Sequence, residues 1–236
     1  LVESAAARAS RQSLLILLGV WVVTSCIAPR LITDIAETLH PAPSGSAMEA
    51  AIDEGMDALP SWSDRTAAVQ ARLMDEYNVE TVEAIPTSVA GHTLLEAERD
   101  ETAVYRDQIE MVQGVYAAQE EVMQLGAVLS PVLAIQIVSM GFAGSDYLHH
   151  RHFVAAAEEY RYTFVQQLNQ DMGDEGASWD YRIGRELWEQ IPAFTYEPPT
   201  VAAIVGQYTM SIILLVGWTV VLLFAAPVAI ASMKVQ

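Results

Sequence analysis

Lysine is almost absent from this 236-residue sequence, in which Lys234 is the only one. A nucleotide-hydrolysing P-loop needs a lysine directly before serine or threonine in a glycine-rich loop, whereas Lys234 is followed by valine. The sequence also lacks the motifs His-Glu-x-x-His, Cys-x-x-Cys and Gly-x-Ser-x-Gly. The single cysteine, Cys26, has no partner for a disulfide framework. We therefore expect a chain that is not an enzyme and carries no cofactor of its own.

Basic residues are scarce, with 12 Lys and Arg against 30 Asp and Glu and a formal net charge of −18. The charge is uneven, because residues 30–200 hold 29 of the acidic residues and 9 arginines, while the two ends together are slightly positive. A surface this acidic repels phosphate backbones. We therefore expect no nucleic-acid partner.

No stretch alternates polar and apolar residues for long enough to predict a strand, so residues 30–200 are predicted to be mainly helical. The expected helices are an extension over 31–39, one over 46–59, one capped by Ser63 and closed by Asn78, a long one from Ser88 past Met123, one after Ser145-Asp146 that Gly173 stops, and a short one around Leu187. The segments 40–45 and 81–86 are expected to be connectors, and 193–199 to be extended.

Two long apolar runs lie near the ends of the chain. Gln12–Ala28 is uncharged and flanked by Arg8, Arg11 and Arg30, and it approaches the length that crosses ~30 Å of hydrocarbon. The alternative for this run is a cleaved signal peptide, but Pro29-Arg30 is a poor cleavage site. Residues 201–231 form the longer run, for which the alternative is a buried soluble helix. We expect both runs to be transmembrane helices.

The basic residues around these runs predict the orientation. Arg8 and Arg11 precede the first run and Lys234 follows the last, which places both ends in the cytoplasm. The predicted divisions are a cytoplasmic stretch 1–11, a span 12–29, an acidic helical extracytoplasmic domain 30–200, a span 201–231 and a cytoplasmic tail 232–236. The expected fold class is an all-α membrane protein, two transmembrane helices flanking a mainly helical domain. Because the chain starts at Leu1 and not at methionine, we expect a fragment, a processed form or part of something longer.

A third apolar run, Leu125–Ala143, allows two interpretations. Its nineteen residues could span a membrane, but it contains a proline, Gln136 and two serines, and a third crossing would put Lys234 outside. The favoured interpretation is a buried or membrane-surface helix. Ser130-Pro131 predicts a helix start with a bend, and Gly144 predicts a helix end.

The histidines that follow this run form the one cluster of potentially reactive side chains. The candidate contact residues are Asp146, Tyr147, His149, His150, Arg151 and His152. His149 and His152 are three residues apart on one helix face, a spacing that Zn or Cu can use if the fold supplies His40 or His92. The favoured interpretation is structural, in which the imidazoles and Asp146 cap helix ends and bond to acidic neighbours. Metal binding and partner contact are the alternatives.

The sequence resembles a known family over essentially its whole length. The resemblance lies in LSPVLAIQIVSMGFAGSDYLHH and RHFVAAAEEYRYTFVQQLNQDM (129–172), in IAPRLITDIAETLHPAPS (27–44), in LPSWSDR (59–65) and in LWEQIPAFTYEPP (187–199). These blocks, in this order, resemble bacterial ABC-2-type transporter permeases with a large extracytoplasmic insert, long filed as a domain of unknown function. Members of that family are longer, and this chain is similar to a later portion: one span, the insert and one span.

The resemblance implies a membrane subunit of an ABC exporter in the bacterial inner membrane, with the large loop in the periplasm. Its partners would be a separate ATPase subunit that holds ATP and Mg²⁺, a second permease subunit and membrane lipid. ATP-driven closure of the ATPase pair would tilt the spans and move the insert with them. The alternatives are a membrane-tethered sensor or assembly module that binds a periplasmic protein, and a histidine-based metal-binding membrane protein.

Overall fold

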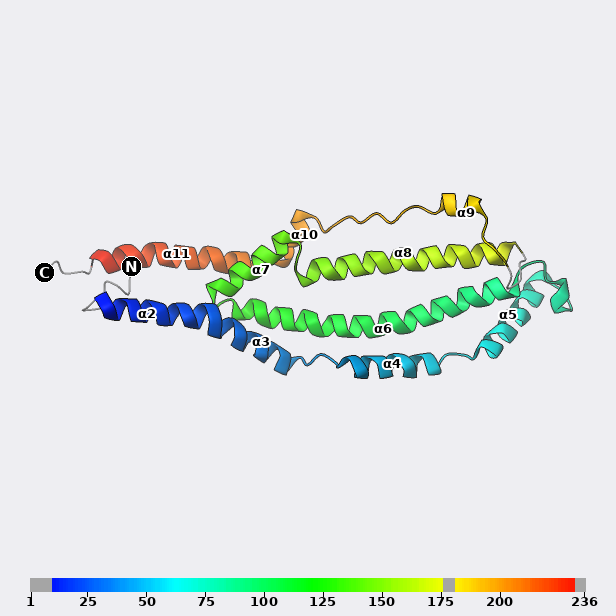
Figure 1. Cartoon of the computed structure of the whole chain (residues 1–236), viewed down its shortest axis with the longest axis horizontal. Coiled ribbons are helices and arrows are strands. Elements are labelled where there is room, and N and C mark those ends of the chain that lie inside the picture. The colour runs from blue at the N-terminus through cyan, green and yellow to red at the C-terminus, as the bar shows by residue number, and fades with distance from the viewer. Residues whose placement is uncertain (1–9, 176–180, 232–236) are drawn as a thin grey trace. The chain divides into compact units, whose positions relative to one another are not determined.

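The computed structural model describes residues 10–175 and 181–231, with side chains for 14–175 and 181–227, and every element in these ranges is helical (Figure 1). The all-α prediction is confirmed for this part of the chain. The basic residues Arg8 and Lys234, which predicted the orientation, lie outside the described residues. The elements are α2 (Ser10–Val22), η1 (Val23–Ile27), α3 (Ala28–Leu39), α4 (Gly45–Asp57), α5 (Trp62–Tyr77), η2 (Val82–Ala84), α6 (Val89–Gly126), α7 (Pro131–Ala143), α8 (Tyr147–Asp174), α9 (Arg185–Gln190), α10 (Val201–Gln207) and α11 (Thr209–Ala231).

The chain divides into two compact units. The first, here called the apolar unit, consists of the residues up to Ala42, Gln113–His152 and the residues from Pro198 onward. The second, the acidic unit, consists of Pro43–Val112 and Phe153–Glu197 and holds 24 of the 30 acidic residues. These units differ from the predicted division at 30–200, because residues 113–152 belong to the same compact unit as the terminal helices.

In the apolar unit, α2, η1 and α3 form one helical run, because Val22, Ile27 and Ala28 all keep helical dihedral angles. The π-helical turn η1 has a local cause. Pro29 has no N–H and cannot continue the backbone ladder. In the π-helical register the amide of Ala28 donates to the carbonyl of Val23. The next carbonyl, that of Thr24, would need an amide donor at Pro29, which has none. The hydroxyl of Ser130 donates to it instead, over 2.7 Å.

Two helices are long and apolar enough to cross a membrane, Leu14–Leu39 and Thr209–Pro227, and few of their side chains are buried. The first extends ten residues beyond the predicted boundary at residue 29, because α3 continues without a break to Leu39. The second is shorter than predicted. Residues 201–231 are not one helix, since Tyr208 separates α10 from α11 with dihedral angles of −102° and 15°.

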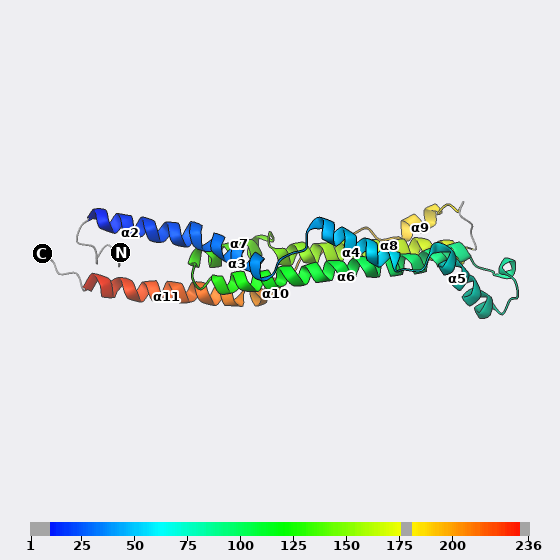
Figure 2. The ribbon, with the colours of Figure 1, turned by 90° about the horizontal axis from the view of Figure 1, so that it is seen from below.

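The apolar run Leu125–Ala143 is interrupted in the structure. Helix α6 ends at Gly126, and α7 begins only at Pro131 and has 13 residues. At 1.5 Å per residue, α7 is about 20 Å long and too short for ~30 Å of hydrocarbon. It packs instead against η1 and α11 (Figures 1 and 2). Leu133 and Ala134 join a buried cluster with Ile32 and Ala127. The structure thus agrees with the buried or surface-lying helix and not with a third span.

Ser130 both caps α7 and anchors it to η1. Its hydroxyl oxygen accepts from the amide of Leu133 over 3.2 Å while it donates to Thr24, and its side chain is fully buried. We expect Ser130→Ala to lower the free energy of unfolding by about 2 kcal/mol, from the lost cap and the unsatisfied buried carbonyl. Ser44→Ala, at the exposed cap of α4, removes a cap alone and should cost about 1 kcal/mol. Equal losses in chemical denaturation followed by circular dichroism would contradict this account.

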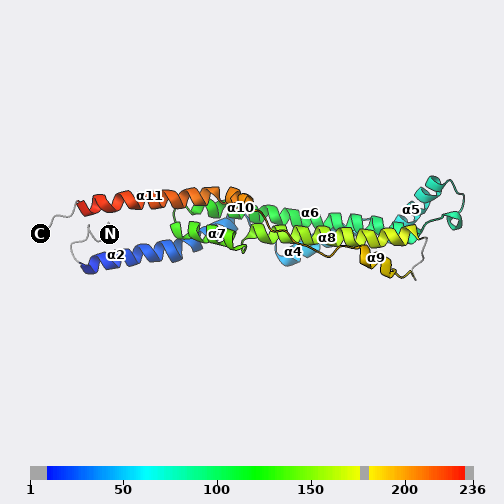
Figure 3. The ribbon, with the colours of Figure 1, turned by 90° about the horizontal axis from the view of Figure 1, so that it is seen from above.

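In the acidic unit, α6 and α8 run side by side in opposite directions (Figures 1 and 3). They approach closely at two glycines, because a Cβ built on Gly91 would lie 2.4 Å from the backbone nitrogen of Gly173. The amide of Ser88 donates to the carbonyl of Gly173 over 2.8 Å, and the Ser88 hydroxyl caps α6 through the amide of Gly91. The cap at Ser88 was predicted; the contact between the two glycines was not.

One predicted cap in this unit is wrong. Helix α5 begins at Trp62 and is capped by Ser61, not by Ser63, because the Ser61 hydroxyl accepts from the amide of Asp64 over 3.2 Å. The Ser61 hydroxyl also donates to the carboxylate of Asp64 over 2.6 Å, which fixes the capping rotamer. The C-terminal prediction is confirmed, since Asn78 ends the helix in the left-handed conformation.

An aromatic cluster holds the returning chain against α8. Residues 193–199, which were predicted to be extended, form no helix or strand and follow α9 along this helix (Figures 1 and 3). Phe153 packs edge-on against Phe194 and Tyr196, and the hydroxyl of Tyr160 donates to the carbonyl of Pro192 over 3.0 Å. Ring contacts thus replace regular hydrogen bonding in this segment.

Candidate functional site

The candidate site is the turn between α7 and α8, and its shape follows from two residues. Gly144 ends α7 in the left-handed region at φ 69°, which only glycine adopts readily. Asp146 then caps α8, because its Oδ1 accepts from the amide of His149 over 3.0 Å. Both features were predicted from the sequence.

Asp146 is buried and has two side-chain partners. Its Oδ1 lies 2.5 Å from Nδ1 of His149, and its Oδ2 accepts from the hydroxyl of Tyr208. Asp146 is 8 % exposed and Tyr208 only 1 %. Gly141 makes room for this ring, because a Cβ on Gly141 would lie 2.4 Å from it. The Asp146 carboxylate thus joins the turn between α7 and α8 to Tyr208, the residue that separates α10 from α11.

The electrostatics of this pair follow from burial and hydrogen bonding. Burial raises the pKa of Asp146, but the bonds from Tyr208 and His149 outweigh it, so the pKa lies below its ordinary value of 3.8. Burial and the bond to Asp146 together raise the pKa of the Tyr208 hydroxyl well above its usual range. At neutral pH the pair is therefore an ionised carboxylate and a neutral phenol that donates to it.

The other predicted contact residues do not all join Asp146. Tyr147 is half-buried, and its ring lies 5.4 Å from that of Tyr116. Arg151 lines a neighbouring hollow, whereas His150 and His152 are exposed. Within the block from Asp146 to His152, Asp146 is therefore buried, Tyr147, His149 and Arg151 are half-buried, and His150 and His152 are exposed.

The histidines do not assemble a metal centre in the described part of the chain. No three His, Cys, Asp or Glu side chains there come close enough to hold a metal ion. His149 directs one ring nitrogen to Asp146, as the structural interpretation predicts. The backbone carbonyl of His40 accepts a hydrogen bond from the side-chain amide of Gln119 over 2.6 Å.

Sequence reasoning missed Tyr208 as a partner of Asp146. A weak indication was present, because Gln207, Tyr208 and Thr209 interrupt the apolar run 201–231. A polar interruption shows that a helix face has a partner, but it does not name the partner. The 62 residues between Tyr208 and Asp146 explain why the pairing could not be read locally.

A pocket of about 230 Å³, here called the tyrosine pocket, lies beside this pair within the apolar unit. Its walls come from α6, α7, the start of α8 and Tyr208. The lining residues are Tyr116, Gln119, Glu120, Met123, Ile137, Met140, Asp146, Tyr147 and Tyr208. Most of its lining is apolar or aromatic, with carboxylates at Glu120 and Asp146.

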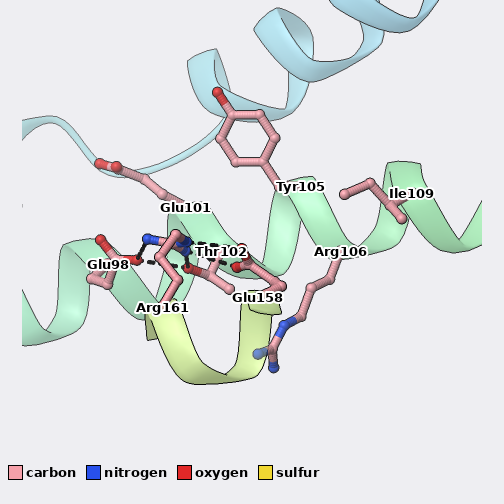
Figure 4. A pocket seen from close by; sticks show the side chains of 8 residues that line it. All are labelled: Glu98, Glu101, Thr102, Tyr105, Arg106, Ile109, Glu158 and Arg161. Atoms are coloured by element: carbon pink, nitrogen blue, oxygen red, sulfur yellow. Dashed lines mark hydrogen bonds and ion pairs between the residues drawn. The ribbon is translucent and has the colours of Figure 1, made fainter. Parts of the chain in front are cut away.

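A second pocket, of about 330 Å³, lies in the acidic unit between α6 and α8 (Figure 4). Arg161 donates to Glu98 over 2.7 Å, to Glu158 over 2.8 Å and to Thr102 over 3.1 Å. The bonds from Arg161 lower the pKa of Glu158 against a smaller opposing effect of burial. Tyr105 points away from this network in Figure 4. We assign the network to structure, because it joins two helices that both carry excess negative charge.

The class defined by these features is a helical protein with two exposed apolar helices and an acidic helical unit. The family model described as domain of unknown function (DUF3526) matches residues 46–197, more than half of the chain. The chain belongs to this family. No curated protein and no solved structure matches it.

Proposed function

We propose that this chain is a membrane subunit of a bacterial ABC exporter, which couples ATP hydrolysis by a separate ATPase subunit to substrate movement. The supporting observation is that the helices Leu14–Leu39 and Thr209–Pro227 are apolar and that few of their side chains are buried. Removing apolar surface from water contributes about 25 cal/mol per Å², so such helices need lipid or protein around them. Lipid is the first partner that this proposal names.

Hydrogen bonds from the α7 segment to both apolar helical runs support the coupling step. Ser130, directly before α7, bonds to the carbonyl of Thr24 in η1, and Asp146, just after α7, accepts from Tyr208 at the start of α11. Helix α6 ends before this segment and α8 begins after it, and both continue into the acidic unit. A tilt of the apolar helices would therefore pull on the helices that lead to the acidic unit.

In this proposal the acidic unit faces the periplasm of the inner membrane, and ATP and Mg²⁺ are held by the ATPase subunit. A second permease subunit completes the transporter. A membrane-tethered sensor or assembly module that binds a periplasmic protein is the competing function for the same topology. The identity of the copurifying subunits separates the two.

The decisive experiment is purification of the tagged chain from native membranes in a mild detergent. We expect an ATPase subunit with a P-loop in stoichiometric amount, and ATP hydrolysis by the complex, because this chain has no P-loop of its own. A complex without an ATPase, with a periplasmic protein in its place, would contradict the exporter and favour the sensor.

Topology is tested separately with a membrane-impermeant maleimide. In a Cys26→Ser background, Ser46→Cys and Ser63→Cys place thiols at exposed positions of the acidic unit. We expect both to be labelled in spheroplasts without permeabilisation. Labelling only after permeabilisation would place the acidic unit in the cytoplasm and overturn the orientation.

A further inference from the structure

We propose that the tyrosine pocket binds a small organic cation with an apolar body, of the kind in which a quaternary ammonium group is attached to an aromatic ring. The site lies wholly within the apolar unit. The proposal rests on aromatic faces, one carboxylate without a cationic partner and an apolar wall.

Tyrosine rings supply the first part of the argument. Tyr116 and Tyr147 line the pocket with ring centroids 5.4 Å apart and planes inclined by 54°, and Tyr208 adds a third ring. The negative face of such a ring attracts a cation placed within ~6 Å of its centroid. Tyr116 and Tyr147 adjoin a pocket, so a ligand in that pocket can lie beside both rings.

Glu120 supplies the charge. In the described chain it forms no ion pair. The side-chain amides of Gln124 and Gln207 each donate to its Oε1 over 3.4 Å, and a hydrogen bond with the Tyr208 hydroxyl makes a minor contribution to the raised pKa of that hydroxyl. Asp146 differs, because Tyr208 and His149 already occupy both of its oxygens. Arg151 and Glu121 line the adjoining hollow with Glu120, and Arg151 forms no ion pair with either carboxylate among the described residues. Glu120 is therefore the carboxylate available to a ligand.

The remaining wall sets the size and the character of the ligand. Met123, Ile137 and Met140 are apolar, and methionine adapts its shape to an irregular ligand. The volume of about 230 Å³ is below the ~300–1,000 Å³ usual for drug-sized ligands, which favours a small molecule. Two carboxylates in the lining disfavour an anion. A neutral apolar molecule would leave Glu120 desolvated without compensation.

The test uses the full chain in a maltoside detergent, since phosphocholine detergents carry quaternary ammonium groups themselves. Two of the nine methionines, Met123 and Met140, line the pocket, so ¹³C-methyl methionine NMR reports on it directly. Their signals are assigned with Met123→Leu and Met140→Leu. The probe is phenyltrimethylammonium, and the control ligand is tert-butylbenzene, in which carbon replaces the charged nitrogen.

We expect saturable shifts of the Met123 and Met140 signals with the cation and none with tert-butylbenzene. Glu120→Gln should weaken binding about tenfold, whereas the matched Glu121→Gln, which removes a charge from the adjoining hollow only, should change it less than twofold. Tyr116→Leu should weaken binding about fivefold, and Tyr77→Leu, an exposed tyrosine outside the pocket, should not.

Three results would each overturn the proposal: no saturable response of the two signals, equal responses to both ligands, or equal affinities of the two glutamine variants. Circular dichroism of each variant separates a lost site from a lost fold. The measurement needs neither an ATPase nor transport. Its failure would therefore leave the exporter proposal standing, and failure of the exporter proposal would leave this site standing.

Discussion

Gly91→Ala is expected to lower the free energy of unfolding of the acidic unit by about 3 kcal/mol, because the added methyl group meets backbone and not a flexible side chain. The new Cβ would lie 2.4 Å from the nitrogen and 2.6 Å from the Cα of Gly173. Relief requires α6 and α8 to separate, which also stretches the bond from Ser88 to Gly173. Thermal and chemical unfolding followed by circular dichroism measure the effect.

Gly114→Ala is the matched control on the same helix. No heavy atom lies within 4 Å of its added Cβ, so the substitution changes only helix propensity and should stabilise by up to about 1 kcal/mol. The two variants, identical in chemistry, are thus expected to move stability in opposite directions. A Gly91→Ala protein as stable as the wild type would show that α6 and α8 do not approach at these glycines.

Tyr208→Phe is expected to cost about 2 kcal/mol, because it leaves Oδ2 of the buried Asp146 carboxylate without its donor while keeping the volume of the ring. Tyr105→Phe is the control, since Tyr105 is about half exposed and its hydroxyl has access to water. It should change stability by less than about 0.5 kcal/mol. Similar losses in the two variants would contradict the pairing of Tyr208 with Asp146.

The pH dependence gives a second measurement on the same pair. The pKa of Asp146 in the folded protein lies below its ordinary value of 3.8, so this group stabilises the fold fully above about pH 4. That contribution is lost as the pH falls through the lower, folded-state pKa. Tyr208→Phe removes one bond that lowers the pKa of Asp146, whereas burial, which raises it, remains. The pKa of Asp146 in the folded protein therefore rises, and the stability that Asp146 loses on acidification becomes smaller. If the free energy of unfolding of Tyr208→Phe fell below about pH 4 as steeply as that of the wild type, this assignment would be contradicted.

Helix ends were predictable where one residue decides them. Ser88, Ser130 and Asp146 are caps because a short polar side chain reaches back to an amide three residues on, and Gly144 is an end because it adopts a positive φ. Such interactions involve neighbours in the sequence. The error at Ser63 has the same origin, since Ser61 and Ser63 compete for one cap and only the rotamers distinguish them.

The candidate site was half predictable. Asp146 and His149 lie within one turn of a helix, so their contact follows from spacing. Tyr208 and the tyrosine pocket depend on α7 folding back onto α11, which brings together residues from three separate parts of the chain. Of the six predicted contact residues, His150 and His152 are exposed and take no part in this contact.

The sequence by itself determined an all-helical chain, two helices apolar enough for a membrane and the caps between them, since propensity, hydrophobicity and capping act over a few neighbouring residues. Tertiary structure decided that residues 113–152 join the terminal helices and not the acidic unit, and that an apolar run of nineteen residues becomes a short packed helix. It also decided the partner of Asp146. Those outcomes depend on contacts across 60 residues and more, where many pairings satisfy the same local pattern and packing selects one.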